Sequence, residues 1–154
     1  MSGAATVKQP TTTVLAPTGY DSATVAQATA STRVLVIDDE LPIRLLCRVN
    51  LEAEGIKVLE AADGPSGLAA ARAQRPDAIV LDVVMPEPDG WRVAERLLDD
   101  PATRGIPIVF LTERTELWSR ADDSRGGVDY LVKPFNPVEL AAAVRNLLER
   151  AGGS

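Results

Sequence analysis

Residues 33–40 read Arg-Val-Leu-Val-Ile-Asp-Asp-Glu, and this stretch decides the fold class. Its first five residues are almost wholly apolar, which is typical of a short strand buried on both faces. Its last three residues are acidic and follow the strand at its carboxyl end. Ligands of open parallel α/β sheets bind beyond the carboxyl ends of the strands, so this pattern predicts a parallel sheet with a polar site at one edge.

The rest of the chain repeats the alternation of strand and helix. Apolar runs predict four further strands, at residues 56–60, 78–81, 106–111 and 130–132. Apolar residues at helical spacing predict helices at residues 40–54, 63–74 and 90–99, and a last helix that Asn136 caps. The fourth helix in chain order, at residues 115–125, has little apolar face and is expected to be short or mobile. The alternation predicts an α/β fold, a doubly wound parallel sheet with helices on both faces.

Composition excludes several classes of function. The chain has 154 residues, of which 45% are apolar and 25% charged, as in ordinary globular proteins. It has one cysteine, Cys47, and no histidine, which excludes the usual zinc sites and every Ser-His or Cys-His nucleophile. Apolar runs fall short of the ~18 residues that a membrane span needs. The net charge of −6 disfavours binding to nucleic acid.

Residues 1–32 differ in kind from the remainder. They contain eight Thr and seven Ala, and only Lys8 and Asp21 are charged. Such a segment buries too little apolar surface to offset its ordering entropy, so we expect a disordered leader, with a short partner-binding segment or a misassigned start codon as alternatives. The expected organisation is a leader at 1–32, one domain at 33–151 and a tail at 152–154.

The polar residues at the predicted strand ends form a set. Each has an ordinary structural explanation alone, as a helix cap, a strand end or a solvated charge. Together they place carboxylates, a hydroxyl and an ammonium at one edge: Asp38, Asp39, Asp82, Thr112 and Lys133. Carboxylates so close repel unless neutralised, and the partner that suits them is a hard, oxygen-preferring cation; we expect Mg²⁺. The set suits phosphoryl transfer with an aspartate oxygen as nucleophile.

These residues lie in motifs that resemble the receiver domain of bacterial two-component response regulators. The resemblance covers roughly Arg33 to Ala151. Its motifs are Ile-Asp-Asp-Glu at 37–40, Leu-Asp-Val-Val-Met-Pro at 81–86 with Asp-Gly at 89–90, Leu-Thr at 111–112, and Asp-Tyr-Leu-Val-Lys-Pro-Phe at 129–135. The resemblance implies a flavodoxin-like (βα)₅ sheet with strand order 2-1-3-4-5.

The resemblance also implies a role for each site residue. Asp82 would be the phosphoacceptor. Asp39 and Asp82 would hold Mg²⁺ with the backbone carbonyl of Val84, and Asp38 would act through a metal-bound water.

Three further residues would respond to the phosphoryl group. Lys133 would grip one of its oxygens, with a cis peptide before Pro134. Thr112 would hydrogen-bond to it and draw Tyr130 inward as a switch. The donor would be a phosphohistidine on a sensor histidine kinase or a phosphotransfer protein.

The chain departs from the family pattern at three positions. Glu113 follows Thr112 where the family usually has a small residue, and we expect it to act as a gate to the site. Val84 offers no polar side chain to guide water. Ala143 stands where regulators that dimerise through their last two helices usually carry Arg, which puts that dimer in doubt.

The expected function is that of a stand-alone, cytoplasmic receiver that signals by protein–protein contact or as a phosphorelay intermediate. We expect no turnover of an external substrate, no direct DNA binding and no membrane association. One alternative is an aspartyl-nucleophile phosphohydrolase, but its acid–base aspartate would stand where this chain has Val84. The other is a receiver-like interaction module that is not phosphorylated, which Glu113 keeps open.

Overall fold

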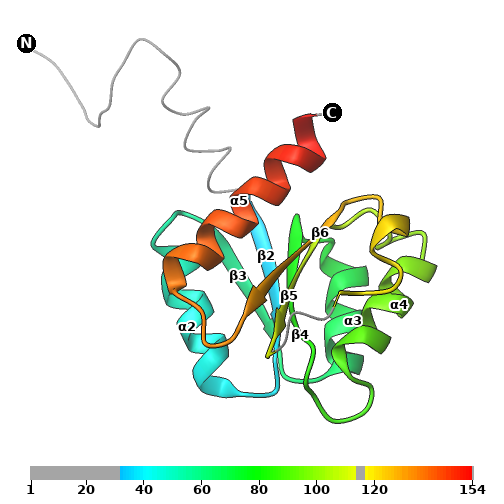
Figure 1. Cartoon of the computed structure of the whole chain (residues 1–154), viewed down its shortest axis with the longest axis horizontal. Coiled ribbons are helices and arrows are strands. Elements are labelled where there is room, and N and C mark those ends of the chain that lie inside the picture. Colours follow the sequence, from blue (N-terminus) through cyan, green and yellow to red (C-terminus); the bar gives the residue numbers. More distant parts are fainter. Residues whose placement is uncertain (1–31, 114–116, 154) are drawn as a thin grey trace, which may run out of the picture. The chain divides into compact units, whose positions relative to one another are not determined.

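Within the residues that the computed structural model describes, 32–113 and 117–153, five strands form one parallel sheet (Figure 1). The strands are β2 (Arg33–Ile37), β3 (Lys57–Ala61), β4 (Ala78–Asp82), β5 (Ile108–Thr112) and β6 (Val128–Val132). Their order in the sheet is β3-β2-β4-β5-β6. The predicted doubly wound fold and the 2-1-3-4-5 order are confirmed.

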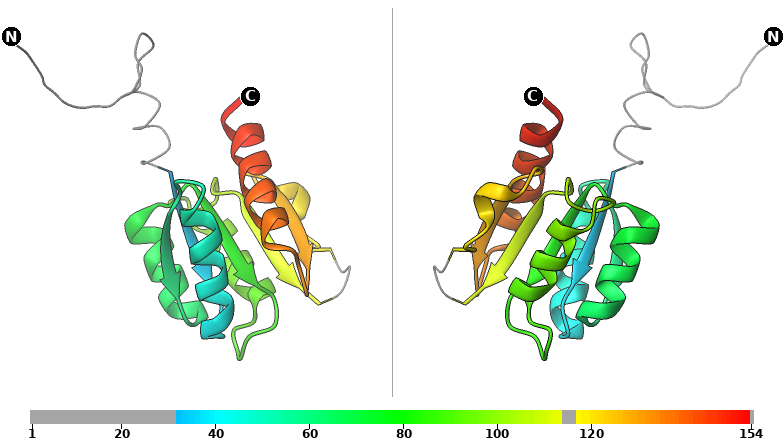
Figure 2. Two further views of the ribbon diagram at one scale, coloured as in Figure 1. Left: turned by 90° about the vertical axis from the view of Figure 1, so that its left-hand side faces the viewer. Right: turned by 90° about the vertical axis from the view of Figure 1, so that its right-hand side faces the viewer.

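Helices cover both faces of this sheet. They are α2 (Leu41–Glu52), α3 (Gly64–Gln74), α4 (Gly90–Asp99) and α5 (Pro137–Gly153). Helices α2 and α5 pack on one face and α3 and α4 on the other, so the two views of Figure 2 each show one pair in front of the strands. Each face has its own apolar core because the side chains of β2 alternate: Val34 and Val36 join one core, Leu35 and Ile37 the other.

Local signals explain where the helices begin. The side chain of Asp89 caps α4 by accepting a hydrogen bond from the amide of Arg92 at 2.9 Å. At the start of α5, the predicted capping box is present: the Val138 amide donates to Asn136 Oδ1 at 3.0 Å, and the Asn136 amide donates to Glu139 Oε1 at 2.9 Å. These bonds satisfy amides that have no partner inside the helix.

The weak helix expected at 115–125 is short, as predicted, in the part of it that the structure describes. That part contains a single 3₁₀ turn, η1 (Ala121–Asp123). Trp118 is buried there, with its ring 5.6 Å from that of Phe110, and its amide donates to Tyr130 Oη at 3.1 Å. The segment is therefore held by an aromatic anchor rather than by a helical apolar face.

Three expectations concern the ends of the chain and membranes. Residues 1–31, the expected leader, lie outside the described residues. Helix α5 continues to Gly153, two residues past residue 151, where we expected the domain to end. Among the described helices, none combines the length and the apolar character that crossing a membrane requires.

Candidate functional site

The carboxyl ends of four parallel strands bring the predicted site residues to one edge of the sheet. Asp38 follows β2, Asp82 ends β4, Thr112 ends β5 and Lys133 follows β6. Strands β4 and β5 are buried along their whole length, which gives Asp82 and Thr112 a rigid support. The side chains at the strand ends meet at this edge because all strands of a parallel sheet have their carboxyl ends on the same side.

Asp38, Asp39 and Asp82 form an acidic cluster. One carboxylate oxygen from each lies within 4.8 Å of the others; Asp38 and Asp82 are buried and Asp39 is exposed. Asp38 Oδ2 is a buried oxygen with no hydrogen-bond partner, a costly state for a carboxylate. Three carboxylates with an oxygen left unsatisfied fit a hard divalent cation, which prefers oxygen ligands. The donor set therefore suits Mg²⁺.

Asp82 is held from two sides through one of its oxygens. Its Oδ1 accepts hydrogen bonds from Lys133 Nζ at 3.1 Å and from the amide of Val84 at 3.2 Å. Lys133 Nζ also lies 3.9 Å from Asp38 Oδ2, so it faces both buried carboxylates. The Lys133–Pro134 peptide is cis, as the resemblance implied. The arrangement leaves Oδ2 of Asp82 outside these two hydrogen bonds.

Burial and mutual interactions shift the pKa values of Asp38, Asp82 and Lys133. It raises the pKa of Asp38 to about 7, with the charge of Asp82 adding to the shift and the Glu40 amide opposing it. Burial also raises the pKa of Asp82, against the hydrogen bond and charge of Lys133. For Lys133, burial lowers the pKa, but the hydrogen bond and charge of Asp82 and the charge of Asp38 raise it overall. A bound cation would favour the ionised form of both carboxyl groups and so lower the pKa values of Asp38 and Asp82.

Thr112 and Tyr130 lie on neighbouring strands. Thr112 is buried, and its carbonyl accepts a hydrogen bond from the Lys133 amide at 2.7 Å. Tyr130 is half-buried and stacks on Phe110 with ring centroids 5.6 Å apart, on the face that α3 and α4 cover. Its hydroxyl accepts the hydrogen bond from the Trp118 amide, so Tyr130 is linked to the segment that follows β5.

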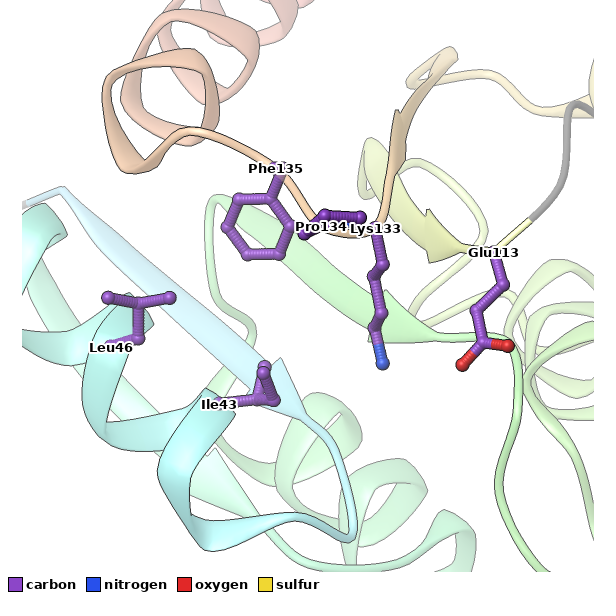
Figure 3. Close-up of a pocket in the computed structure, with 6 residues that line it drawn as sticks. All are labelled: Ile43, Leu46, Glu113, Lys133, Pro134 and Phe135. Carbon is purple, nitrogen blue, oxygen red and sulfur yellow. The ribbon is translucent and has the colours of Figure 1, made fainter.

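A groove of about 530 Å³ opens beside Lys133 (Figure 3). Ile43 and Leu46 of α2 line one wall, and Pro134 and Phe135 line another. Glu113 is exposed; its side chain and that of Lys133 extend in the same direction from the ends of β5 and β6. The mouth of the site thus combines apolar walls with one cation and one exposed carboxylate.

One group that touches the site was not predicted from the sequence. Arg44 of α2 donates from Nη1 to the carbonyl oxygen of Asp38 at 2.8 Å and from Nε to Glu60 Oε1 at 3.0 Å. A signal was present, because Arg44 and Arg48 stand four residues apart beside a strand that carries Glu60.

The fold and site define a class: doubly wound α/β proteins with an acidic site and a lysine at the carboxyl edge of the sheet. A family model described as the response regulator receiver domain matches residues 34–145. The chain belongs to this family.

Relatives of known name agree with this assignment. The chain is 41% identical over 119 residues to the DNA-binding dual master transcriptional regulator RpaA of Synechocystis, a match that covers 77% of this chain and 49% of that protein. It is 45% identical over 119 residues to the response regulator PleD of Caulobacter vibrioides, covering 76% of this chain and 26% of PleD. The chain thus spans about half or less of the length of these relatives.

A solved structure agrees as well. The chemotaxis protein CheY4 of Vibrio cholerae matches with a TM-score of 0.67 and 32% identity, covering 75% of this chain and 98% of that one.

Proposed function

We propose that this receiver accepts a phosphoryl group on Asp82 from a phosphohistidine of a sensor histidine kinase or a phosphotransfer protein, in an Mg²⁺-dependent reaction. The observation that carries the proposal is the position of the Asp82 carboxylate. It is buried at a strand end, hydrogen-bonded to Lys133 Nζ, and within reach of two further aspartates.

Mg²⁺ would be held by the carboxylates of Asp39 and Asp82 and the backbone carbonyl of Val84, with Asp38 acting through a water molecule. When bound, the cation supplies positive charge that offsets the repulsion between the acidic residues and the phosphoryl oxygens. Two observations support this division of roles: Asp39 is exposed, and Oδ2 of Asp38 is buried without a hydrogen-bond partner.

The chain's own residues account for the transfer step. An oxygen of the ionised Asp82 carboxylate attacks phosphorus, and the P–N bond to the donor breaks as the new O–P bond forms. The electron pair stays on the imidazole, which leaves as a neutral ring when its other nitrogen is protonated. The ammonium of Lys133 binds a phosphoryl oxygen and Thr112 donates its hydroxyl to the product, which biases Tyr130 as a switch.

The groove beside Lys133 supports a protein as the donor. Exposed apolar side chains also occur on the helices that follow β2 and β6: Leu45 on α2 is 47% exposed and Val138 on α5 is 71% exposed. We propose that Glu113, at the mouth of this groove, is a gate that slows small anionic donors. A protein donor would instead dock through a surface that is complementary to the groove.

We also propose that the phosphorylated receiver signals in the cytoplasm by protein–protein contact. It would either bind a downstream target or pass the phosphoryl group on as a phosphorelay intermediate. The curated relatives are longer than this chain and include DNA-binding regulators, so the stand-alone arrangement stays a prediction. Receivers act as signalling modules, and turnover of external phosphoesters is not part of the proposal because the exposed Val84 carries no acid–base group.

The test is to incubate the full chain with acetyl phosphate and Mg²⁺ and to weigh it intact. The wild type should gain the mass of one phosphoryl group, and Asp82→Asn should not. Asp39→Ala should weaken Mg²⁺ binding by well over tenfold, which corresponds to more than ~1.4 kcal/mol. An undiminished gain in Asp82→Asn would overturn the assignment, and no gain in the wild type would favour a receiver-like module that is not phosphorylated.

A further inference from the structure

Arg44 joins strand β3 to the loop that carries two of the three aspartates. Its side chain is 15% exposed. Its Nη1 donates to the Asp38 carbonyl at 2.8 Å, and its Nε donates to Glu60 Oε1 at 3.0 Å. The rigid, planar guanidinium therefore spans from an anchored carboxylate to the backbone of the site.

Glu60 is itself fixed from a second direction. Its Oε2 accepts a hydrogen bond from Arg48 Nε at 2.6 Å, and Arg48 Nη2 reaches the carbonyl of Val58 at 3.3 Å. These hydrogen bonds from Arg48 and Arg44 lower the pKa of Glu60, which keeps it ionised. Because both Glu60 oxygens are engaged, Glu60 can hold the Arg44 guanidinium in one orientation.

The carbonyl that Arg44 holds belongs to the peptide bond between Asp38 and Asp39. A peptide unit is planar, so fixing its oxygen also fixes the amide of Asp39 and the direction in which the chain continues. Two other hydrogen bonds hold this loop: the Asp38 amide donates to Ala61 O at 3.1 Å, and the Glu40 amide donates to Asp38 Oδ1 at 2.9 Å. Neither of them is made to the Asp38 carbonyl oxygen, which accepts its hydrogen bond from Arg44.

We propose that Arg44, oriented by Glu60, is a positioning residue that sets the Asp38–Asp39 peptide so that both carboxylates converge with Asp82 on the cation. The inference rests on the metal-holding role proposed above for these aspartates. Mg²⁺ demands near-ideal ligand geometry, so a rotated peptide should lower its affinity even if the fold persists.

The experiment compares Arg44→Met with Arg48→Met in the full chain. Both changes keep an apolar stem and remove a guanidinium that is bonded to Glu60, but only Arg44→Met frees the Asp38 carbonyl. Titration with MgCl₂ in a calorimeter should show affinity about tenfold weaker in Arg44→Met and within about twofold of wild type in Arg48→Met. Arg44→Lys should not restore affinity, because one ammonium cannot reproduce the planar fork.

A second measurement needs no metal. In ¹⁵N-labelled, metal-free protein, Arg44→Met should shift the amide resonances of Asp39 and Glu40, and Arg48→Met should leave them near their wild-type positions. Unchanged amides and unchanged Mg²⁺ affinity in Arg44→Met, or equal losses in both variants, would overturn the inference. If the wild type bound no Mg²⁺, the proposed function would fail, and the amide shifts would still decide whether Arg44 sets the peptide.

Discussion

At the scale of single residues, the buried Asp38 lowers the stability of the folded, metal-free protein above neutral pH. Burial raises its pKa from 3.8 to about 7. Below pH 4 the folded and unfolded chains both hold the proton, and Asp38 contributes nothing. Between pH 4 and 7 the unfolded chain releases it first, so stability falls with rising pH, and above pH 7 the whole penalty is present.

Asp38→Asn should therefore stabilise the metal-free protein at pH 8 and have little effect at pH 4, since Asn mimics the protonated acid. The full shift sets an upper limit of roughly 4 kcal/mol, and we expect about 2 kcal/mol at pH 8. Thermal unfolding in chelator at both pH values measures the effect, as a Tm rise of at least about 4 °C at pH 8. A gain of the same size at both pH values would rule out titration of Asp38 as its cause.

A substitution at Glu113 tests whether this residue hinders the approach of a phosphodonor to the site. Its exposed carboxylate lies at the groove that also exposes Lys133, and a small anionic donor crosses this mouth. Glu113→Ala should speed labelling by acetyl phosphate several-fold, since like charges a few ångströms apart repel even where solvent screens them. Loss of the aspartyl phosphate should also quicken, because water enters by the same route.

The control for this change is Glu149→Ala, which removes the same charge from an exposed position on α5. Time courses of intact mass give both rates. Equal rates in Glu113→Ala and wild type would make Glu113 a surface charge without a gating role.

At the scale of elements, the start of α4 packs directly against the strand end that carries Asp82. A Cβ on Gly90 would lie 2.2 Å from the carbonyl oxygen of Asp82 and 2.6 Å from Val83 Cα. The Gly90 amide donates to the Val83 carbonyl at 2.9 Å, which holds the contact together. The helix can approach this closely only because the position has no side chain.

Gly90→Ala should destabilise the protein by about 3 kcal/mol and slow phosphorylation, because backbone at Asp82 must move. Gly105→Ala is the matched control: a Cβ there meets nothing within 4 Å, and its cost should stay within about 0.5 kcal/mol. Urea unfolding and labelling by acetyl phosphate measure the two effects. Normal stability in Gly90→Ala would show that α4 does not constrain Asp82.

At the scale of the whole molecule, charge bears on the choice of partner. The chain has 16 Lys and Arg against 22 Asp and Glu, which gives a net charge of −6. We therefore expect output through protein surfaces rather than through DNA.

The purified chain should show no sequence-specific DNA binding at physiological salt, whether or not it is phosphorylated. Fluorescence anisotropy with labelled duplexes, in the presence of competitor DNA, measures this. RpaA serves as the positive control for the assay format. A nanomolar, sequence-dependent complex with this chain alone would contradict the expectation.

The sequence by itself determined the elements and the meeting of the site residues. Strands, helices and caps follow from local patterns, such as the apolar run before Asp38 and the capping box at Asn136. The convergence of Asp38, Asp82 and Lys133 then follows from topology, because parallel strands end at one edge. The strand order, which the structure confirms, and the roles that we predict for the residues came from the motifs that resemble receivers.

Only the tertiary structure decided how the polar groups pair. In it, Lys133 donates to Oδ1 of Asp82, and Asp38 Oδ2 has no hydrogen-bond partner and lies 3.9 Å from Lys133 Nζ. The tertiary structure also joined Arg44 to Glu60 and to the Asp38 carbonyl, and it seated Trp118 against Phe110. These pairings join residues from 6 to 51 positions apart. Most depend on where separate elements pack and on which oxygen each donor reaches, and local periodicity carries no information on either.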